Sequence, residues 1–216
     1  MNLEEKEYFL KAGFTTEQYE EIRTGKKQGL NVAIYANKNF LPIQMRQIRL
    51  GLLEGLAVEN YAKIEYDWFQ MEEIRCGLKS GVDTSVFADY KIPYEKMRQL
   101  RKGLEAGMDL SEYTYLNAGV IRQIRKAGLS GVDLSSHIER SYDAEQLQEI
   151  RYALEKGIDL DKYITVSFRA ASIAEIRIGL EQGIAVEDYA TMEYNWQQMR
   201  EIRKGMEHRL DVEQYI

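Results

Sequence analysis

The chain has 216 residues, of which 44% are hydrophobic and 30% are charged, and its formal net charge is −6. This composition can bury an apolar core, which argues against intrinsic disorder. The acidic balance argues against direct nucleic-acid binding, because proteins that bind duplexes gain most of their affinity by neutralising phosphates.

The cellular compartment follows from the apolar segments and from cysteine usage. The apolar runs are too short to cross a bilayer, and the glutamate-rich start of the chain does not have the pattern of a signal peptide. A single cysteine, Cys76, cannot form an internal disulfide and fits a reducing compartment. The sequence therefore predicts a cytoplasmic protein without a membrane-spanning segment.

An Ile-Arg step, once Leu-Arg, recurs along the chain at intervals of 26 residues, with one interval of 24. Its arginines are Arg23, Arg49, Arg75, Arg101, Arg125, Arg151, Arg177 and Arg203. Such a period is typical of solenoids, in which each copy buries its apolar face only by stacking on its neighbours. We therefore predict an all-α fold, an α-solenoid of eight copies of about 26 residues, each with one main helix and a short helical or 3₁₀ turn.

In chain order, residues 1–14 are expected to cap the array, and the whole chain, 1–216, is expected to form a single helical-repeat domain. The copies occupy about 15–40, 41–66, 67–92, 93–116, 117–142, 143–168, 169–194 and 195–216. The step into the fifth copy is two residues short, which predicts a local change in curvature.

Each main helix has a recognisable beginning. Eight residues before the arginine, five copies carry residues that cap helix N-termini well: Thr15, Asp67, Asn117, Asp143 and Asn195. In four of these copies a glutamine follows three residues later, which is the capping-box pattern: Gln18, Gln70, Gln146 and Gln198. Pro42 falls at a first helical position. An apolar column four residues before the arginine faces the core, and each main helix is expected to have about 13 residues.

Each main helix also has a recognisable end. A glycine six residues after each of the first seven arginines predicts a left-handed C-cap: Gly29, Gly55, Gly81, Gly107, Gly131, Gly157 and Gly183. An aspartate stands eight residues after the arginine in five copies and a ring stands twelve residues after it in all eight, which indicates a single short turn that closes each copy. The rings are Tyr35, Tyr61, Phe87, Tyr113, His137, Tyr163, Tyr189 and Tyr215.

The arginine column permits two interpretations. One arginine per copy could contact one phosphate or base, as in helical-repeat proteins that read RNA. The arginine lies at the border of the apolar stripe, however, where its stem can pack on the core while the guanidinium meets an acid. We interpret the column as a structural ladder. Its expected partners are the aspartates eight residues later: Asp83, Asp109, Asp133, Asp159 and Asp211.

Nothing in the sequence indicates catalysis, a metal site or a cofactor. His137 takes the place of a repeat aromatic, and neither it nor His208 belongs to a set of residues with metal-ligand spacing. Cys76 lacks a neighbouring pair of basic residues that would mark a nucleophile. We therefore expect no catalytic residues, no metal and no cofactor, and predict that the protein is not an enzyme.

Candidate binding residues are the exceptions on the outer face of the helices. The positions six before and one after the arginine should be exposed, and in the first, fourth and eighth copies they are polar. Other copies carry apolar or aromatic groups there or close by: Ile43, Leu50, Leu53, Phe69, Cys76, Tyr152 and Ile178. Adjacent exposed apolar side chains indicate a partner-binding patch. The alternative is that the short turns cover these side chains, which would make them a second core face.

Segments 97–113 and 198–206 show the repeat most clearly, as in Gln-Met-Arg-Glu-Ile-Arg-Lys-Gly-Met at 198–206. Over nearly its whole length the chain resembles short helical-repeat proteins of phage and mobile elements of gut bacteria. That resemblance implies a repeat fold, and it suggests an inhibitor of a host defence protein or nuclease that acts in the host cytoplasm.

The sequence therefore favours a non-enzymatic scaffold that binds a protein partner. Two alternatives remain open at this point. The chain could be an acidic nucleic-acid mimic or an RNA-binding solenoid, or it could form a homo-oligomer through its apolar patch.

Overall fold

The computed structural model describes residues 3–208 and 210. This part of the chain is all α-helical with short 3₁₀ turns, and it contains no strand. It divides into two compact units, Met1–Tyr115 and Leu116–Ile216. The division falls where the sequence repeat is two residues short.

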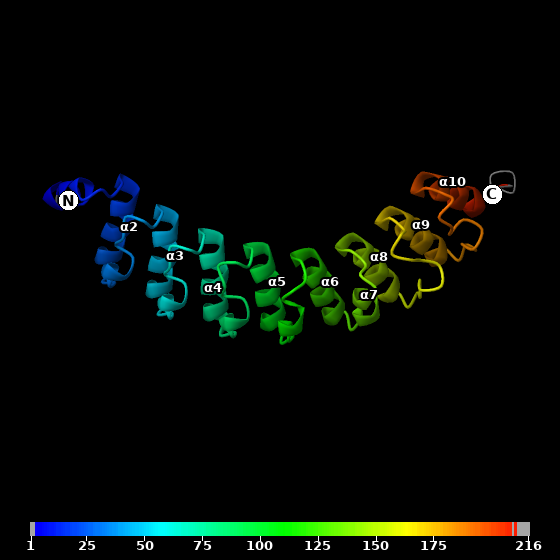
Figure 1. Cartoon of the computed structure of the whole chain (residues 1–216), viewed down its shortest axis with the longest axis horizontal. Coiled ribbons are helices and arrows are strands. Elements are labelled where there is room, and N and C mark those ends of the chain that lie inside the picture. The colour runs from blue at the N-terminus through cyan, green and yellow to red at the C-terminus, as the bar shows by residue number, and fades with distance from the viewer. Residues whose placement is uncertain (1–2, 209, 211–216) are drawn as a thin grey trace. The chain divides into compact units, whose positions relative to one another are not determined.

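In the first unit the helices pack on one another in chain order, α1 on α2, α2 on α3, α3 on α4 and α4 on α5 (Figure 1). The α-helices are α1 (Leu3–Lys11), α2 (Thr16–Lys27), α3 (Pro42–Leu53), α4 (Trp68–Ser80) and α5 (Tyr94–Glu105). A 3₁₀ turn follows each of the last four: η1 (Val32–Ile34), η2 (Val58–Asn60), η3 (Thr84–Val86) and η4 (Ser111–Tyr113).

In the second unit α6 packs on α8, α8 on α9 and α9 on α10. The helices are α6 (Ala118–Leu129), the short α7 (Ser135–Glu139), α8 (Ala144–Leu154), α9 (Ala170–Glu181) and α10 (Trp196–Glu207). Hydrogen-bonded turns stand in place of a 3₁₀ helix after α8 and α9. The main helices of both units have 11 to 13 residues, close to the expected 13.

The predicted helix starts are confirmed. Each of the five capping side chains accepts a backbone N–H of the first turn, and the four capping boxes with glutamine are formed. Pro42 is the first residue of α3. Because these caps satisfy N–H groups that have no partner within the helix, they fix where these five main helices begin.

The predicted helix ends are confirmed as well. All seven glycines of the column have a positive φ, between 69° and 75°. A side chain with a Cβ rarely adopts this conformation, and so the glycine lets the chain leave the helix and enter the short turn.

The core follows the apolar column of the main helices. Each of its members is 2% exposed or less: Tyr19, Met45, Met71, Met97, Ile121, Leu147, Ile173 and Met199. The ring column is more varied. Tyr35, Tyr61, Phe87 and Tyr189 are fully buried, whereas Tyr113 and Tyr163 are half-buried, and the neighbouring Leu110 and Leu160 fill the core in their copies. Tyr215 and Asp211 lie outside the described residues.

A second glycine column, two residues after the arginine, makes room for these rings. The hydroxyl of Tyr61 donates to the carbonyl of Gln47 at 3.2 Å, and it would lie 1.9 Å from a Cβ at Gly51. Gly25 and Gly179 face Tyr35 and Tyr189 in the same way. The column becomes alanine only in the fifth and sixth copies, where the ring is a histidine or a half-buried tyrosine. Because these glycines have no side chain, the helix surface leaves room for the buried rings of Tyr35, Tyr61 and Tyr189.

Among residues 3–208 and 210, no helix is both long and apolar enough to cross a membrane.

Candidate protein-binding surface

Within each unit, the arginine ladder connects a main helix to the preceding main helix. In six copies the Nε of the arginine donates, at 2.7–3.2 Å, to the side chain of the residue 28 positions earlier. The pairs are Arg49 with Glu21, Arg75 with Gln47, Arg101 with Glu73, Arg151 with Gln123, Arg177 with Glu149 and Arg203 with Glu175. These contacts recur between neighbouring helices, which agrees with a structural role for the column.

A second acceptor binds Nη1 of each of these arginines. It is a side chain at the end of the preceding helix, as for Arg75 with Glu54 at 2.9 Å, or one on the next turn, as for Arg101 with Glu105 at 2.6 Å. Burial opposes the charge of Arg101, but its hydrogen bonds to Glu73 and Glu105 outweigh burial and raise its pKa. These guanidiniums therefore already have carboxylate or amide partners along two of their edges.

The aspartates eight residues after the arginine are not its partners, and that expectation was wrong. Asp83, Asp109 and Asp133 accept the backbone N–H two residues later, at 2.9 Å in each case. Asp159 does the same at 2.8 Å. A short acidic side chain that follows the glycine reaches its own turn more easily than the side of the helix. The aspartates therefore cap the short turn.

Arg23 differs from the six paired arginines. Among residues 3–208 and 210, its guanidinium donates only to Glu20 of the same helix, at 2.7 Å. The Arg23 side chain is 29% exposed. Arg125 also has an interaction in the structure. Because a partly exposed pair within one helix contributes little to stability, Arg23 is an internal control for the ladder.

The outer-face residues of the first unit lie on α3 and α4. Ile43 and Leu53 are exposed, at 37% and 52%. Leu50, Phe69 and Cys76 are half-buried. The short turns therefore do not bury these side chains completely, and α3 presents a row of apolar groups to the surface.

Phe69 has partners within the chain that the sequence did not reveal. Its ring stacks on Trp68, with centroids 3.5 Å apart, and on Tyr94 of α5, at 4.5 Å. The guanidinium of Arg98 lies 5.3 Å from the centre of the Tyr94 ring. The packing of α4 on α5 therefore already uses an apolar group at Phe69. The aromatic residues sit on consecutive helices, and only the packed structure brings them together.

In the second unit Tyr152 and Ile178 are half-buried. The Tyr152 ring lies between two ladder arginines, 4.4 Å from the guanidinium of Arg151 and 5.6 Å from that of Arg177. Cation–π contacts of this kind hold the ring against its own helix face. Tyr152 is therefore occupied by the ladder, and it is a weaker candidate for partner binding than the residues of α3.

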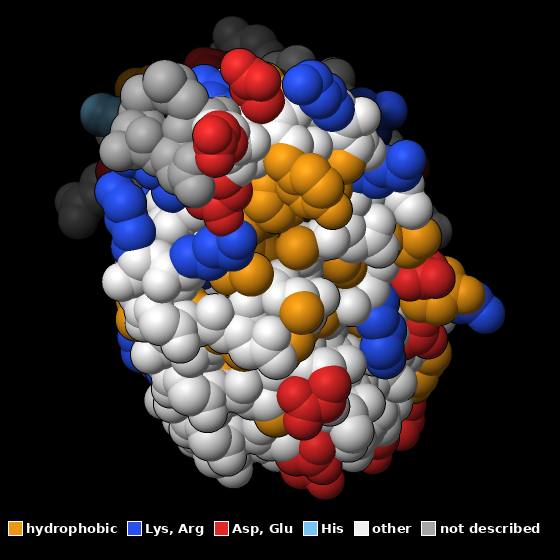
Figure 2. All heavy atoms as spheres, turned by 90° about the vertical axis from the view of Figure 1, so that its left-hand side faces the viewer, with side chains coloured by type: hydrophobic (Ala, Val, Ile, Leu, Met, Phe, Trp, Pro, Cys, Tyr) orange, Lys and Arg blue, Asp and Glu red, His pale blue; other side chains and the backbone are white. Residues whose placement is uncertain are grey.

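A further apolar area lies at the N-terminal end of the first unit. Figure 2 faces this end, and hydrophobic side chains gather in its middle, with charged groups around them. Phe9 of α1 packs edge-on against Phe14, with centroids 5.3 Å apart, and lies 5.7 Å from Tyr19. Tyr8 and Leu10 of the same helix stay exposed. The helix α1 thus covers core residues of α2 and leaves apolar atoms of its own at the surface.

The N-terminal ends of the main helices carry a different set of contacts. Three of the capping-box glutamines, and Gln44 of α3, also reach across to the loop that precedes the next helix. Gln70 Nε2 donates to the carbonyls of Tyr90 and Ile92 at 2.9 and 2.8 Å. Gln18 and Gln146 make the same pair of bonds, and Gln44 makes one. Each of these glutamines therefore caps its own helix and ties down the next loop.

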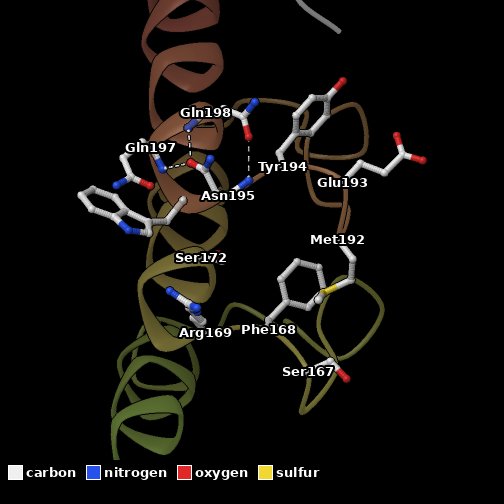
Figure 3. A pocket seen from close by; sticks show the side chains of 11 residues that line it. Ser167, Phe168, Arg169, Ser172, Met192, Glu193, Tyr194, Asn195, Gln197 and Gln198 are labelled. Atoms are coloured by element: carbon white, nitrogen blue, oxygen red, sulfur yellow. Dashed lines mark hydrogen bonds between the residues drawn. The ribbon is translucent and has the colours of Figure 1, made fainter.

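The equivalent residue of α9 is Ser172, which is too short to reach the next loop. A hollow of about 410 Å³ lies at this place, between the start of α9 and the loop and first turn of α10 (Figure 3). Phe168, Met192, Tyr194 and Trp196 line it together with polar groups that include Asn195 and Gln197. In Figure 3 Phe168 points toward Met192, and Asn195 points toward the first turn of α10, whose Gln197 and Gln198 amides it caps.

The side chains that could be reactive, Cys76 and His137, lie in partly or fully buried surroundings. Burial raises the pKa of the Cys76 thiol, which disfavours the thiolate that nucleophilic chemistry requires. His137 is buried in the place of a repeat ring, and its Nε2 lies 2.9 Å from Asp161 Oδ1, which also accepts from Arg140 at 2.7 Å. In the part of the chain that the structure describes, no three His, Cys, Asp or Glu side chains are grouped as metal ligands.

The chain matches no protein-family model, no curated protein and no solved structure at a significant level.

Proposed function

We propose that this chain is a non-enzymatic scaffold, an α-solenoid of eight copies that binds a protein partner through the outer face of α3 and its neighbour α4. The observation that carries the proposal is the row of apolar groups on α3. The equivalent positions of α5 carry Glu95 and Lys102, both exposed. The repeat tolerates charge at these sites, and a partner is the simplest reason for Ile43 and Leu50 to be apolar.

The solenoid part of the proposal is supported by the ladder. The same arginine contact to a residue 28 positions earlier occurs between α2 and α3, α3 and α4, and α4 and α5 in the first unit. It recurs between α6 and α8, α8 and α9, and α9 and α10 in the second. A contact that repeats with the sequence period is what stacked copies of one unit require.

The aromatic cluster beside α3 supports a protein partner. Trp68, Phe69 and Tyr94 are half-buried and stacked on one another. Half-buried rings next to exposed aliphatic groups are the composition typical of the centre of a protein interface. The carboxylate partners of the arginine ladder, by contrast, would repel phosphates, and they weaken the RNA-binding alternative.

The proposal is tested with a triple variant of α3, Ile43→Glu, Leu50→Lys and Leu53→Glu. Each change introduces a residue type that α5 carries at the same position, namely Glu95, Lys102 and Glu105. The matched control is Leu129→Glu in α6, at the position equivalent to Leu53 and 60% exposed. The measurements are the melting temperature and affinity capture from a bacterial lysate, with and without nuclease.

We expect the wild type and the control to capture the same protein in both conditions, and the triple variant to lose it at an unchanged melting temperature. Loss of the captured protein on nuclease treatment would favour the nucleic-acid alternative. Normal capture by the triple variant would exclude the α3 surface.

A further inference from the structure

The hollow beside Ser172 occupies the place that a glutamine side chain fills in other copies. One copy earlier, Gln146 Nε2 donates to the carbonyls of Val166 and Phe168, at 2.9 and 2.6 Å. Ser172 is the corresponding residue of α9, 26 positions later, and Met192 is the counterpart of Val166. A serine ends one atom beyond its Cβ, so the space that the carboxamide group fills at Gln146 is left to the hollow.

A second tie of the earlier copy is also absent at this junction. The Tyr142 hydroxyl donates to the carbonyl of Ile164, and the Tyr66 hydroxyl donates to that of Ala88. Phe168 stands at the same position and has no hydroxyl to donate. The start of α9 therefore lacks both side-chain donors that join the start of a helix to the following loop elsewhere in the array.

The lining of the hollow suits a small neutral group with a short apolar stem. Phe168 and Met192 supply apolar walls, and Ser172, Asn195 and Gln197 supply polar ones (Figure 3). Trp196 also lines the hollow. Arg169 and Glu193 bring one charge of each sign. Its volume of about 410 Å³ lies within the range of roughly 300–1,000 Å³ that is common for ligand sites.

We infer that this hollow is a binding site for a primary carboxamide, such as a glutamine or asparagine side chain presented by another protein. The amide N–H₂ of the ligand takes the role of Gln146 Nε2 and donates to the Met192 carbonyl. The amide oxygen accepts from Ser172 or Gln197, and the stem packs against Phe168 and Trp196. The inference goes beyond the proposed function, because it concerns a different unit and can be tested without any protein partner.

The test uses propionamide as the probe and the indole N–H signals of the two tryptophans in ¹H–¹⁵N spectra as the readout. Trp196 lines the hollow, and Trp68 lies in the first unit, where it serves as an internal control. Propionate, 2-butanone and methylguanidine are the comparison probes. Propionate and 2-butanone lack the N–H₂ donor, the first as an anion and the second as a neutral molecule. Methylguanidine replaces the carboxamide by a cation.

We expect propionamide to shift the Trp196 signal in a saturable manner and to leave the Trp68 signal in place, with at least a fivefold weaker response to the other probes. Ser172→Gln should abolish the response, because its own carboxamide takes the position of the ligand's carboxamide at the Met192 carbonyl. An unchanged Trp196 signal with propionamide, or the same response in Ser172→Gln, would overturn the inference. A stronger response to methylguanidine would overturn the assignment of the ligand as a carboxamide.

Discussion

The arginine contacts and the contacts at the helix N-termini behave differently along the chain. In six copies the arginine Nε meets the side chain 28 residues earlier, always at hydrogen-bond distance. At the helix N-termini of four copies, a glutamine donates a hydrogen bond to a carbonyl of the next loop. In the fourth copy Lys96 donates to the Thr114 carbonyl instead. In two other copies the glutamine is replaced by Val120 and by Ser172.

This difference shows which contacts the repeat requires. The ladder gives each buried or half-buried guanidinium a carboxylate or amide partner, and a charge at such a place without its partner is strongly unfavourable. Some of the loop carbonyls that the glutamines reach belong to exposed residues, such as Tyr90 and Val166, and water can satisfy them instead, so loss of the glutamine costs less. The arginine contacts therefore stay uniform, whereas the helix N-termini vary and can acquire a hollow.

The largest effect is expected at the ladder, for Arg203→Ala. The Arg203 and Glu175 side chains are 8% and 10% exposed. Removal of the guanidinium would leave the nearly buried Glu175 carboxylate without this ion pair. We expect the free energy of unfolding to fall by about 3 kcal/mol in a denaturant titration. Arg23→Ala, the control at a partly exposed pair within one helix, should cost less than about 1 kcal/mol. Equal losses of unfolding free energy for the two variants would mean that the ladder contacts stabilise the fold no more than a pair within one helix does.

The next largest effect is expected for Gly51→Ala, which changes the glycine that makes room for the buried Tyr61 ring. The new Cβ would lie 1.9 Å from the Tyr61 hydroxyl, so the ring must move, and we expect a loss of about 2 kcal/mol in the same titration. Tyr61→Phe removes the clashing oxygen, and the nearest ring carbon then lies 3.1 Å from the Cβ. The double variant should therefore be more stable than Gly51→Ala alone. Additive losses would mean that the glycine serves another purpose.

Gln146→Ser copies the N-terminus of α9 onto α8. It removes two hydrogen bonds to the loop at Val166 and Phe168 and one to the Asp143 amide. Water can replace part of these bonds, so we expect a loss of about 1–2 kcal/mol, smaller than at the ladder. A loss as large as that of Arg203→Ala would contradict the proposed difference between the two sets of contacts.

Ser172→Gln makes the opposite change. It should restore the tie to the loop before α10 and raise the free energy of unfolding by about 1 kcal/mol. Slower hydrogen exchange of the amides in the 191–194 loop would locate the gain. The matched Ser172→Ala variant should change neither quantity. A destabilised Ser172→Gln variant would mean that the hollow does not have the shape of a glutamine side chain.

The smallest effect is a pH dependence at the end of the ladder. Hydrogen bonds from Lys79 and Arg75 hold the pKa of Glu54 below its usual value of 4.5. A carboxylate with a lowered pKa in the folded state stabilises the fold above pH 4.5, and this contribution is lost as the pH falls below that value. Glu54→Gln should therefore flatten the acid side of the stability profile, by less than about 1 kcal/mol. An unchanged acid limb would exclude this contribution.

The sequence predicted the local structure well because helix caps and left-handed glycines act within a few residues. Thr15, Asp67 and Gly81 could be assigned their roles from spacing alone, and the structure confirms them. The arginine column was correctly placed at the border of the core, but its partners were assigned to the wrong residues. Glu21 and Arg49 are 28 residues apart, and only the packing of α3 on α2 makes them neighbours.

The candidate sites were predicted less well for the same reason. The stack of Phe69 on Tyr94 depends on the distance and rotation between α4 and α5, which no pattern within one helix encodes. The hollow at Ser172 could have been found in the sequence, since the column of glutamines changes to serine there. Its meaning depends on the loop carbonyls that those glutamines reach, and these are visible only in the structure.

The most direct test of the account compares two variants in one capture experiment with a melting curve. Arg75→Ala changes a constant residue of the repeat, and the triple variant of α3 changes residues that vary between copies. We expect Arg75→Ala to melt at a lower temperature and still capture the partner protein below that temperature, and the triple variant to melt like the wild type and capture nothing. The reverse result, a ladder variant of normal stability that loses its partner and a surface variant that unfolds, would contradict the account.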